Sequence, residues 1–139
     1  MAQAFDLAMI DTVRAMVEVI RDRGGLSFVF DVQEGTRFLA AIGTWLEHAS
    51  IDLEAFDCRS NKVVTLRFGF GNDDQVEYRK DGIAFVLSRD ACDYALHKLA
   101  ELNGMGGFST PEFLQFDQPK GKGALVDTFL AVRQRTDQI

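Results

Sequence analysis

The stretch from Lys62 to Ser88 constrains the fold more than any other part of the chain. Apolar and polar residues alternate there in three short runs, which turn-forming residues separate. Alternation with a period of two is typical of strands with one buried face. The stretch therefore predicts three antiparallel strands joined by tight turns. The apolar members of the runs are Val64, Leu66, Phe68 and Phe70, then Val76 and Tyr78, then Ile83, Phe85 and Leu87.

The dipeptide Asp81-Gly82 separates the second and third runs. Asp-Gly favours a type I′ turn, whose two central residues both take positive φ angles, and such turns connect many two-residue hairpins. The sequence therefore predicts a tight hairpin with positive φ at Asp81 and at Gly82.

Four helices are predicted from apolar residues that recur at helical spacing. Thr36 and Ser88 precede two of them as possible N-caps, and Gly24-Gly25 follows the first as a possible C-terminal stop. The predicted helices span Ala4–Arg23, Arg37–His48, about Arg89–Asn103 and roughly Ala124–Arg135.

The remaining segments complete the expected topology. Leu26–Val32 alternates as a strand, and Phe113–Phe116 fits a short edge strand within the glycine-rich segment Gly104–Gly123. Residues 50–61 fit either a strand or a helical turn, because periodicity does not separate the two over so few residues. No internal repeat is evident.

The chain of 139 residues is expected to form a single α+β domain over residues 1–139. This domain would have an antiparallel sheet of four to five strands, helices packed mainly on one face, and the order α-β-α-β-β-β-α-(β)-α.

The charge of the chain bears on its partners. The formal net charge is −6, and residues 1–60 carry ten acidic and five basic side chains. Nucleic acid is therefore not expected as a partner, because phosphate binding depends on Lys and Arg. No run of apolar residues is long enough to predict a membrane span. Two widely separated cysteines and no recognisable leader favour a cytoplasmic protein.

The first candidate site is an acidic segment that contains no basic residue. Its carboxylates would attract a basic protein partner and speed the encounter, if they cluster. A solvated loop that keeps the protein soluble is the simpler interpretation. These residues are Glu47, Asp52, Glu54 and Asp57.

The second candidate is a group of aromatic residues in the glycine-rich segment. Phe113 and Phe116, with Phe108, either fold back onto the sheet or form a lid or an arm that enters a partner subunit. Together with apolar residues on the second face of the sheet, they predict a homodimer.

The third candidate is the run Lys120-Gly121-Lys122-Gly123 at the start of the last predicted helix. Free backbone N–H groups at a helix N-terminus attract anions, and glycine lets an anion approach closely. The run lacks the spacing of a P-loop, so a flexible surface turn is the simpler interpretation. If it does bind an anion, the pocket would lie under the segment of residues 104–123.

Chemistry-bearing side chains form no recognisable catalytic or metal-binding pattern. His48, Cys58, Cys92 and His97 are too widely spaced for a compact zinc site, and no motif implies a cofactor. Catalytic residues are therefore not assigned. The sequence favours a non-catalytic protein-interaction module, such as an adaptor, inhibitor or immunity-type protein, that uses an acidic surface. The alternative is a small domain that binds an anionic ligand, or an enzyme with an unrecognised site.

Overall fold

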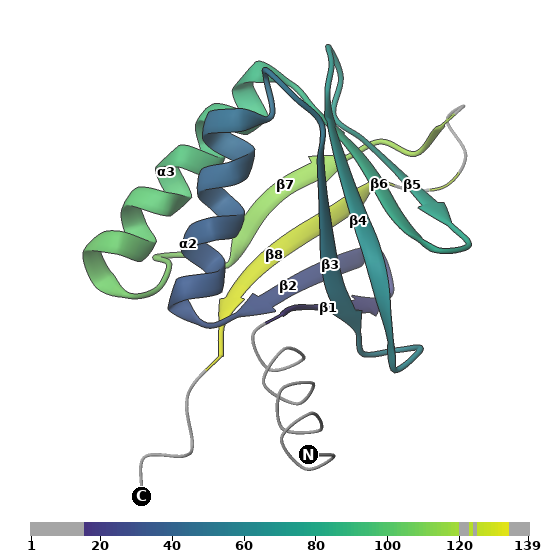
Figure 1. Cartoon of the computed structure of the whole chain (residues 1–139), viewed down its shortest axis with the longest axis horizontal. Helices are drawn as coiled ribbons and strands as arrows, with labels where there is room; N and C mark the ends of the chain where they lie inside the picture. The colour runs from purple at the N-terminus through teal and green to yellow at the C-terminus, as the bar shows by residue number, and fades with distance from the viewer. Residues whose placement is uncertain (1–15, 120–122, 124, 134–139) are drawn as a thin grey trace, which may run out of the picture.

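The computed structural model describes residues 16–119, 123 and 125–133, and most of them form β-structure (Figure 1). Eight strands, two α-helices and a short π-helical segment, η1, are present in these ranges. In chain order they are β1 Val17–Asp22, β2 Gly25–Phe30, α2 Val32–Ala40, η1 Ala41–Trp45, β3 Ile51–Asp57, β4 Lys62–Phe70, β5 Gln75–Arg79, β6 Gly82–Leu87, α3 Arg89–Met105, β7 Glu112–Phe116 and β8 Val126–Val132.

The strands form one mixed sheet that curls into a nearly closed barrel. Their order is β5-β6-β4-β3-β1-β2-β8-β7. The two edge strands meet at a single parallel bridge between Gln75 and Asp117. The predicted α+β fold, with an antiparallel sheet of four to five strands, is therefore wrong. The sheet has eight strands instead of four to five, and three of its strand pairs are parallel.

Two segments predicted as helices are strands, which is the main reason for the difference. In β1, Val17 and Val19 are buried while Glu18 and Ile20 are more exposed, so the side chains alternate between two faces. In β8, Val126, Thr128 and Leu130 are buried by the same alternation. β-branched residues are common in both segments and favour strands. Residues 4–15 of the first predicted helix lie outside the described residues.

The three strands between Lys62 and Ser88 are confirmed, but they do not form a simple meander. β6 inserts between β4 and β5, and it pairs with β4 in parallel through six register pairs from Thr65–Gly82 to Phe70–Leu87.

Neither Asp81 nor Gly82 has a positive φ, so the predicted type I′ turn is also wrong. Gly82 serves a different purpose. A Cβ atom at this position would overlap the carbonyl oxygen of Thr65, so glycine permits the close approach of β4.

The helices begin at side-chain caps. The oxygen of Asp31 accepts a hydrogen bond of 2.8 Å from the backbone N–H of Glu34, so α2 starts before the predicted Thr36 cap. Ser88 caps α3 as predicted, through the N–H of Ala91. The helix ends at Gly106, whose φ of +70° is the left-handed conformation that glycine adopts easily.

The structure reveals an internal repeat that the sequence did not make evident. Residues 17–70 and residues 75–132 both form a hairpin, a helix and a second hairpin. In each half a glycine, Gly25 or Gly82, begins the second strand, and a helix cap, Asp31 or Ser88, follows six residues later. The strands between them read GLSFVF and GIAFVL. The halves join through two parallel seams, β4 with β6 and β2 with β8.

The core lies between the curled sheet and the two helices. α2 and α3 pack side by side over one side of the barrel (Figure 1). Aromatic rings from distant strands meet beneath them, and the rings of Phe68 and Phe85 stack with centroids 4.8 Å apart. This arrangement leaves the hairpin turns on the side of the molecule away from the helices (Figure 1).

Candidate functional site

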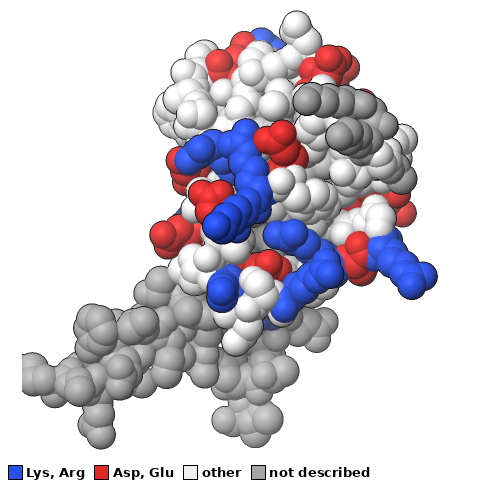
Figure 2. Space-filling model, turned by 90° about the vertical axis from the view of Figure 1, so that its right-hand side faces the viewer, with Lys and Arg blue, Asp and Glu red and all other residues white. Residues whose placement is uncertain are grey.

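Strand directions bring three hairpin turns to one end of the barrel. β1 and β3 run parallel, so the turns that follow them lie at the same end. β4 and β6 also run parallel, so the turns that precede them meet there as well. We call this region the turn end. Figure 2 views it directly and shows that Lys and Arg side chains gather on this face.

A cleft of about 650 Å³ opens at the turn end. Five cationic and two anionic side chains line it, which gives the lining a net charge of +3, although the whole chain has a net charge of −6. The cationic residues are Arg21, Arg59, Lys62, Arg79 and Lys80; the anionic ones are Asp57 and Asp81. The cleft is therefore a local basic site on an acidic protein.

Asp57 organises one side of the cleft. It is 4% exposed at the end of β3. Its carboxylate accepts hydrogen bonds from the Ser60 hydroxyl at 2.9 Å and from the backbone N–H of Arg59 at 3.2 Å. It also lies 3.6 Å from a guanidinium nitrogen of Arg21. These contacts fix the turn between β3 and β4 and hold the Arg21 side chain against the barrel.

Two of the five cations already have partners. Besides its ion pair with Asp57, Arg21 lies over the ring of Tyr78, 5.0 Å from its centroid. Burial raises the pKa of the Tyr78 hydroxyl, and the nearby charge of Arg21 offsets part of this effect. Arg79 pairs with Glu77 at 2.8 Å.

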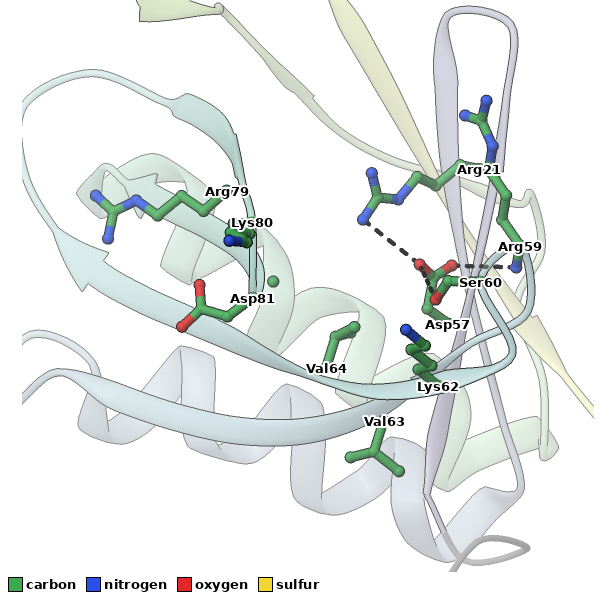
Figure 3. A pocket seen from close by; sticks show the side chains of 11 residues that line it. Arg21, Asp57, Arg59, Ser60, Lys62, Val63, Val64, Arg79, Lys80 and Asp81 are labelled. Carbon is green, nitrogen blue, oxygen red and sulfur yellow. Dashed lines mark hydrogen bonds and ion pairs between the residues drawn. The ribbon is translucent and has the colours of Figure 1, made fainter.

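The other three cations make no side-chain hydrogen bond or ion pair with any described residue. They are Arg59, Lys62 and Lys80, and all are exposed to solvent. Figure 3 shows the lining in two groups, with Arg79 and Lys80 on one side, Arg21 and Arg59 on the other, and Val64 between them. An anion in this cleft could contact cations from both sides, and such charge-assisted hydrogen bonds are among the strongest in proteins.

The four acidic residues predicted as a partner-binding site lie in different surroundings, and their role in binding a partner stays a prediction. Asp57 is buried against Arg21, Asp52 pairs with Arg67 on β4 at 3.0 Å, and Glu47 pairs with Arg89 at the start of α3. Glu54 lies exposed on β3, opposite Thr65. Three of the four carboxylates are thus each matched by an arginine.

The other predicted site residues are placed as follows. Phe113 and Phe116 lie on β7 with 9% and 2% exposure, so their rings belong to the core of this chain. Gly123 is exposed with a φ of +88°. Lys120, Gly121 and Lys122 lie outside the described residues. The predicted basic run and the pocket beneath it stay predictions.

Lys98, a buried cation outside the cleft, has a structural role. Lys98 of α3 is 1% exposed, and its ammonium group donates a hydrogen bond of 2.9 Å to the carbonyl of Thr110. It also lies 3.5 Å from the carboxylate of Glu101. The hydroxyl of Ser109 donates to Glu101, and this bond, together with the charge of Lys98, lowers the pKa of that carboxyl. These contacts attach the segment before β7 to α3.

Sequence reasoning missed the five cations of the cleft because they are far apart in the chain. A signal was present, since each of them lies within a few residues of a turn. Arg21 precedes Gly24-Gly25, Arg59 and Lys62 flank Asn61, and Arg79-Lys80 precedes Asp81. Recognising them as one site required the knowledge that these turns share one end of the barrel.

The described part of the chain was also compared with the requirements of a metal site and of a membrane-spanning helix. No three His, Cys, Asp or Glu side chains there are arranged to hold a metal ion. Among the same residues, no helix is both long and apolar enough to cross a membrane. Neither a family model, nor a curated protein, nor a solved structure matches this chain.

Proposed function

We propose that the protein is a binding module for an anionic ligand that carries phosphate or carboxylate groups. The observation that carries this proposal is the cleft at the turn end, where the lining has a net charge of +3 on a chain with a net charge of −6. Like charges gathered in this way repel one another, and a bound anion would relieve that repulsion. Of the two functions that the sequence suggests, this geometry supports anion binding better than an acidic interaction surface.

The arrangement of the cleft favours a ligand with more than one anionic group. Cations on both of its sides have side chains with no partner among the described residues, and Val63 and Val64 supply apolar contact between them. A ligand that spans the cleft would engage Lys80 on one side and Arg59 on the other. The Ser60 hydroxyl and the backbone groups near Asp57 offer further polar contacts.

The test is a calorimetric titration of the full chain with each of three probes: tripolyphosphate, inorganic phosphate and an oligoglutamate peptide. We expect tripolyphosphate or the peptide to bind more tightly than phosphate, because each offers several anionic groups. Raising the salt concentration should weaken binding, since exposed charges are screened within about 10 Å at 0.1 M salt. Tighter binding of tripolyphosphate would indicate a small phosphorylated ligand, and tighter binding of the peptide an acidic protein segment.

Matched variants locate the site. Exchanging Lys62→Gln together with Lys80→Gln should weaken binding about tenfold or more, because charged hydrogen bonds contribute about 1.5–3 kcal/mol each. The control, Arg37→Gln with Arg89→Gln, removes the same charge from α2 and α3 and should bind as the unaltered chain does. Equal affinity of the two variants, or no binding of any probe, would show the proposal to be wrong.

A further inference from the structure

A second hollow lies away from the basic cleft, between the helices and the sheet. It is an apolar groove of about 330 Å³. Residues of α2 and η1 form one side, and residues of β1, β3 and β4 form the other. The lining residues are Val17, Glu34, Arg37, Phe38, Ala41, Ile42, Ile51, Leu53 and Phe68.

The groove exposes part of the hydrophobic core. Phe38, Ile42 and Phe68 at its base are almost fully buried, whereas Ile51 and Leu53 are only half-buried. The charged residues of the lining, Glu34 and Arg37, pair with each other at 3.0 Å. An apolar hollow that continues into the core is typical of a surface that another apolar group covers.

The chain itself supplies a candidate for that group. Val17, which lines the groove, is the second described residue, and β1 begins between α2 and β3 (Figure 1). The preceding segment, residues 1–15, is therefore tethered at the edge of the groove. Its sequence places Phe5, Met9 and Val13 at intervals of four, the spacing of an apolar helical stripe. We propose that residues 1–15 of this same chain bind along the groove with this stripe facing Ile51 and Leu53.

Length and charge agree with this occupant. A helix of 15 residues would be about 22 Å long, and the stretch Val32–Trp45 beside the groove covers about 21 Å by the same rise. The side chain of Arg37 is 74% exposed at the rim, and the segment carries Asp6, which lies beside the stripe on a helical projection and can face it. The covalent tether gives the segment a high effective concentration at the groove, so even a modest apolar contact suffices.

Disulfide cross-linking in the full chain tests the proposal. Cys58→Ser removes the exposed cysteine, and Cys92 is buried. In this background Leu53→Cys is combined in turn with Phe5→Cys, Met9→Cys and Val13→Cys. We expect an intramolecular disulfide in at least one of these chains under mild oxidation. The controls combine Leu53→Cys with Gln3→Cys or Arg14→Cys, on the opposite side of the helical projection, and should cross-link much less.

Other outcomes contradict the proposal. Equal cross-linking in the test and control chains would mean that the stripe does not face the groove. Covalent dimers in place of intramolecular products would assign the groove to the segment of a second copy.

A measurement without cysteines gives an independent check. Phe5→Asp with Met9→Asp changes the net charge by −2, and so does the control, Gln3→Asp with Arg14→Gln. We expect the first pair to shift the methyl NMR signals of Ile51 and Leu53 and to increase the binding of an apolar dye, and the control to do neither. Amide signals of β4 and β6 report that the barrel remains folded. The same response in both variants would overturn the proposal. This test does not depend on whether the cleft binds an anion.

Discussion

At the scale of single residues, Asp57 determines the shape of the candidate binding cleft. Its carboxylate is buried and joins the Ser60 hydroxyl, the Arg59 amide and the Arg21 guanidinium. A buried charge is costly unless such partners compensate it. Removal of the charge therefore leaves Arg21 without its counterion and loosens the turn that carries Arg59.

We expect Asp57→Asn to lower the free energy of unfolding by about 1–3 kcal/mol, because a charged partner is removed from a buried group. Asp52→Asn is the matched control on the same strand. Its ion pair with Arg67 is exposed on both sides, so its loss should cost less than about 1 kcal/mol. Urea unfolding of both variants gives the comparison. Equal destabilisation would mean that the contacts of Asp57 add nothing beyond a surface pair.

The same residues show what the sequence could reveal about the site. The four carboxylates are close in the chain, but their spacing left open whether they cluster. Two of them instead form ion pairs with arginines that are far away in sequence. Arg21 lies 36 positions before Asp57, and Arg89 lies 42 positions after Glu47. Such pairs form only when the strands and helices come together, so local patterns carry no trace of them.

At the scale of elements, the close approach of β4 and β6 depends on Gly82. The backbone of Thr65 occupies the space where a side chain would begin, and the Thr65 N–H donates a hydrogen bond of 3.2 Å to the carbonyl of Asp81. The repeat offers a close parallel, because the N–H of Asp127 donates to the carbonyl of Gly24 at 3.1 Å, beside Gly25. Both parallel seams thus begin at a glycine.

Gly82→Ala should lower the free energy of unfolding by about 1–3 kcal/mol, since the added methyl group forces β4 and β6 apart. Gly104→Ala is the control. Nothing lies within 4 Å of a Cβ atom there, and the residue is part of α3, so alanine should leave stability unchanged or raise it by about 0.5–1 kcal/mol. Thermal or chemical unfolding measures both. A harmless Gly82→Ala substitution would contradict the packing described for this seam.

Sequence patterns predicted the middle of the molecule better than its ends. The strands from Lys62 to Leu87 and the helix capped by Ser88 are confirmed, because their patterns were long or were bounded by clear signals. β1 and β8 were predicted as helices, since six or seven apolar-rich residues fit either period. The parallel pairing of β4 with β6 could not be predicted, because alternation shows which residues face the core but not which strands are neighbours.

At the scale of the whole molecule, the joins between neighbouring strands of the barrel differ in length. The two seams between the halves, β4 with β6 and β2 with β8, each contain six register pairs. The strands β5 and β7 meet through one bridge, with hydrogen bonds from Val76 to Asp117 at 2.9 Å and from Asp117 to Asp74 at 3.0 Å. The pseudo-equivalent pair in the first half, β1 with β3, has three register pairs. The β5–β7 contact is therefore the weakest join of the ring.

This inequality predicts where the molecule opens first. Hydrogen exchange measured by NMR should show that the amides of Val76 and Asp117 exchange at least about tenfold faster than those in the two long seams, because a short ladder opens locally without global unfolding. Val76 is fully buried, so exposure in the folded state cannot produce the effect at this amide. Low concentrations of urea should leave the exchange of these two amides almost unchanged, since a local opening uncovers little surface, while they accelerate the seam amides. Equal protection and equal urea dependence at all three joins would mean that the sheet opens only as a unit, and that the single bridge closes the barrel as firmly as a full ladder.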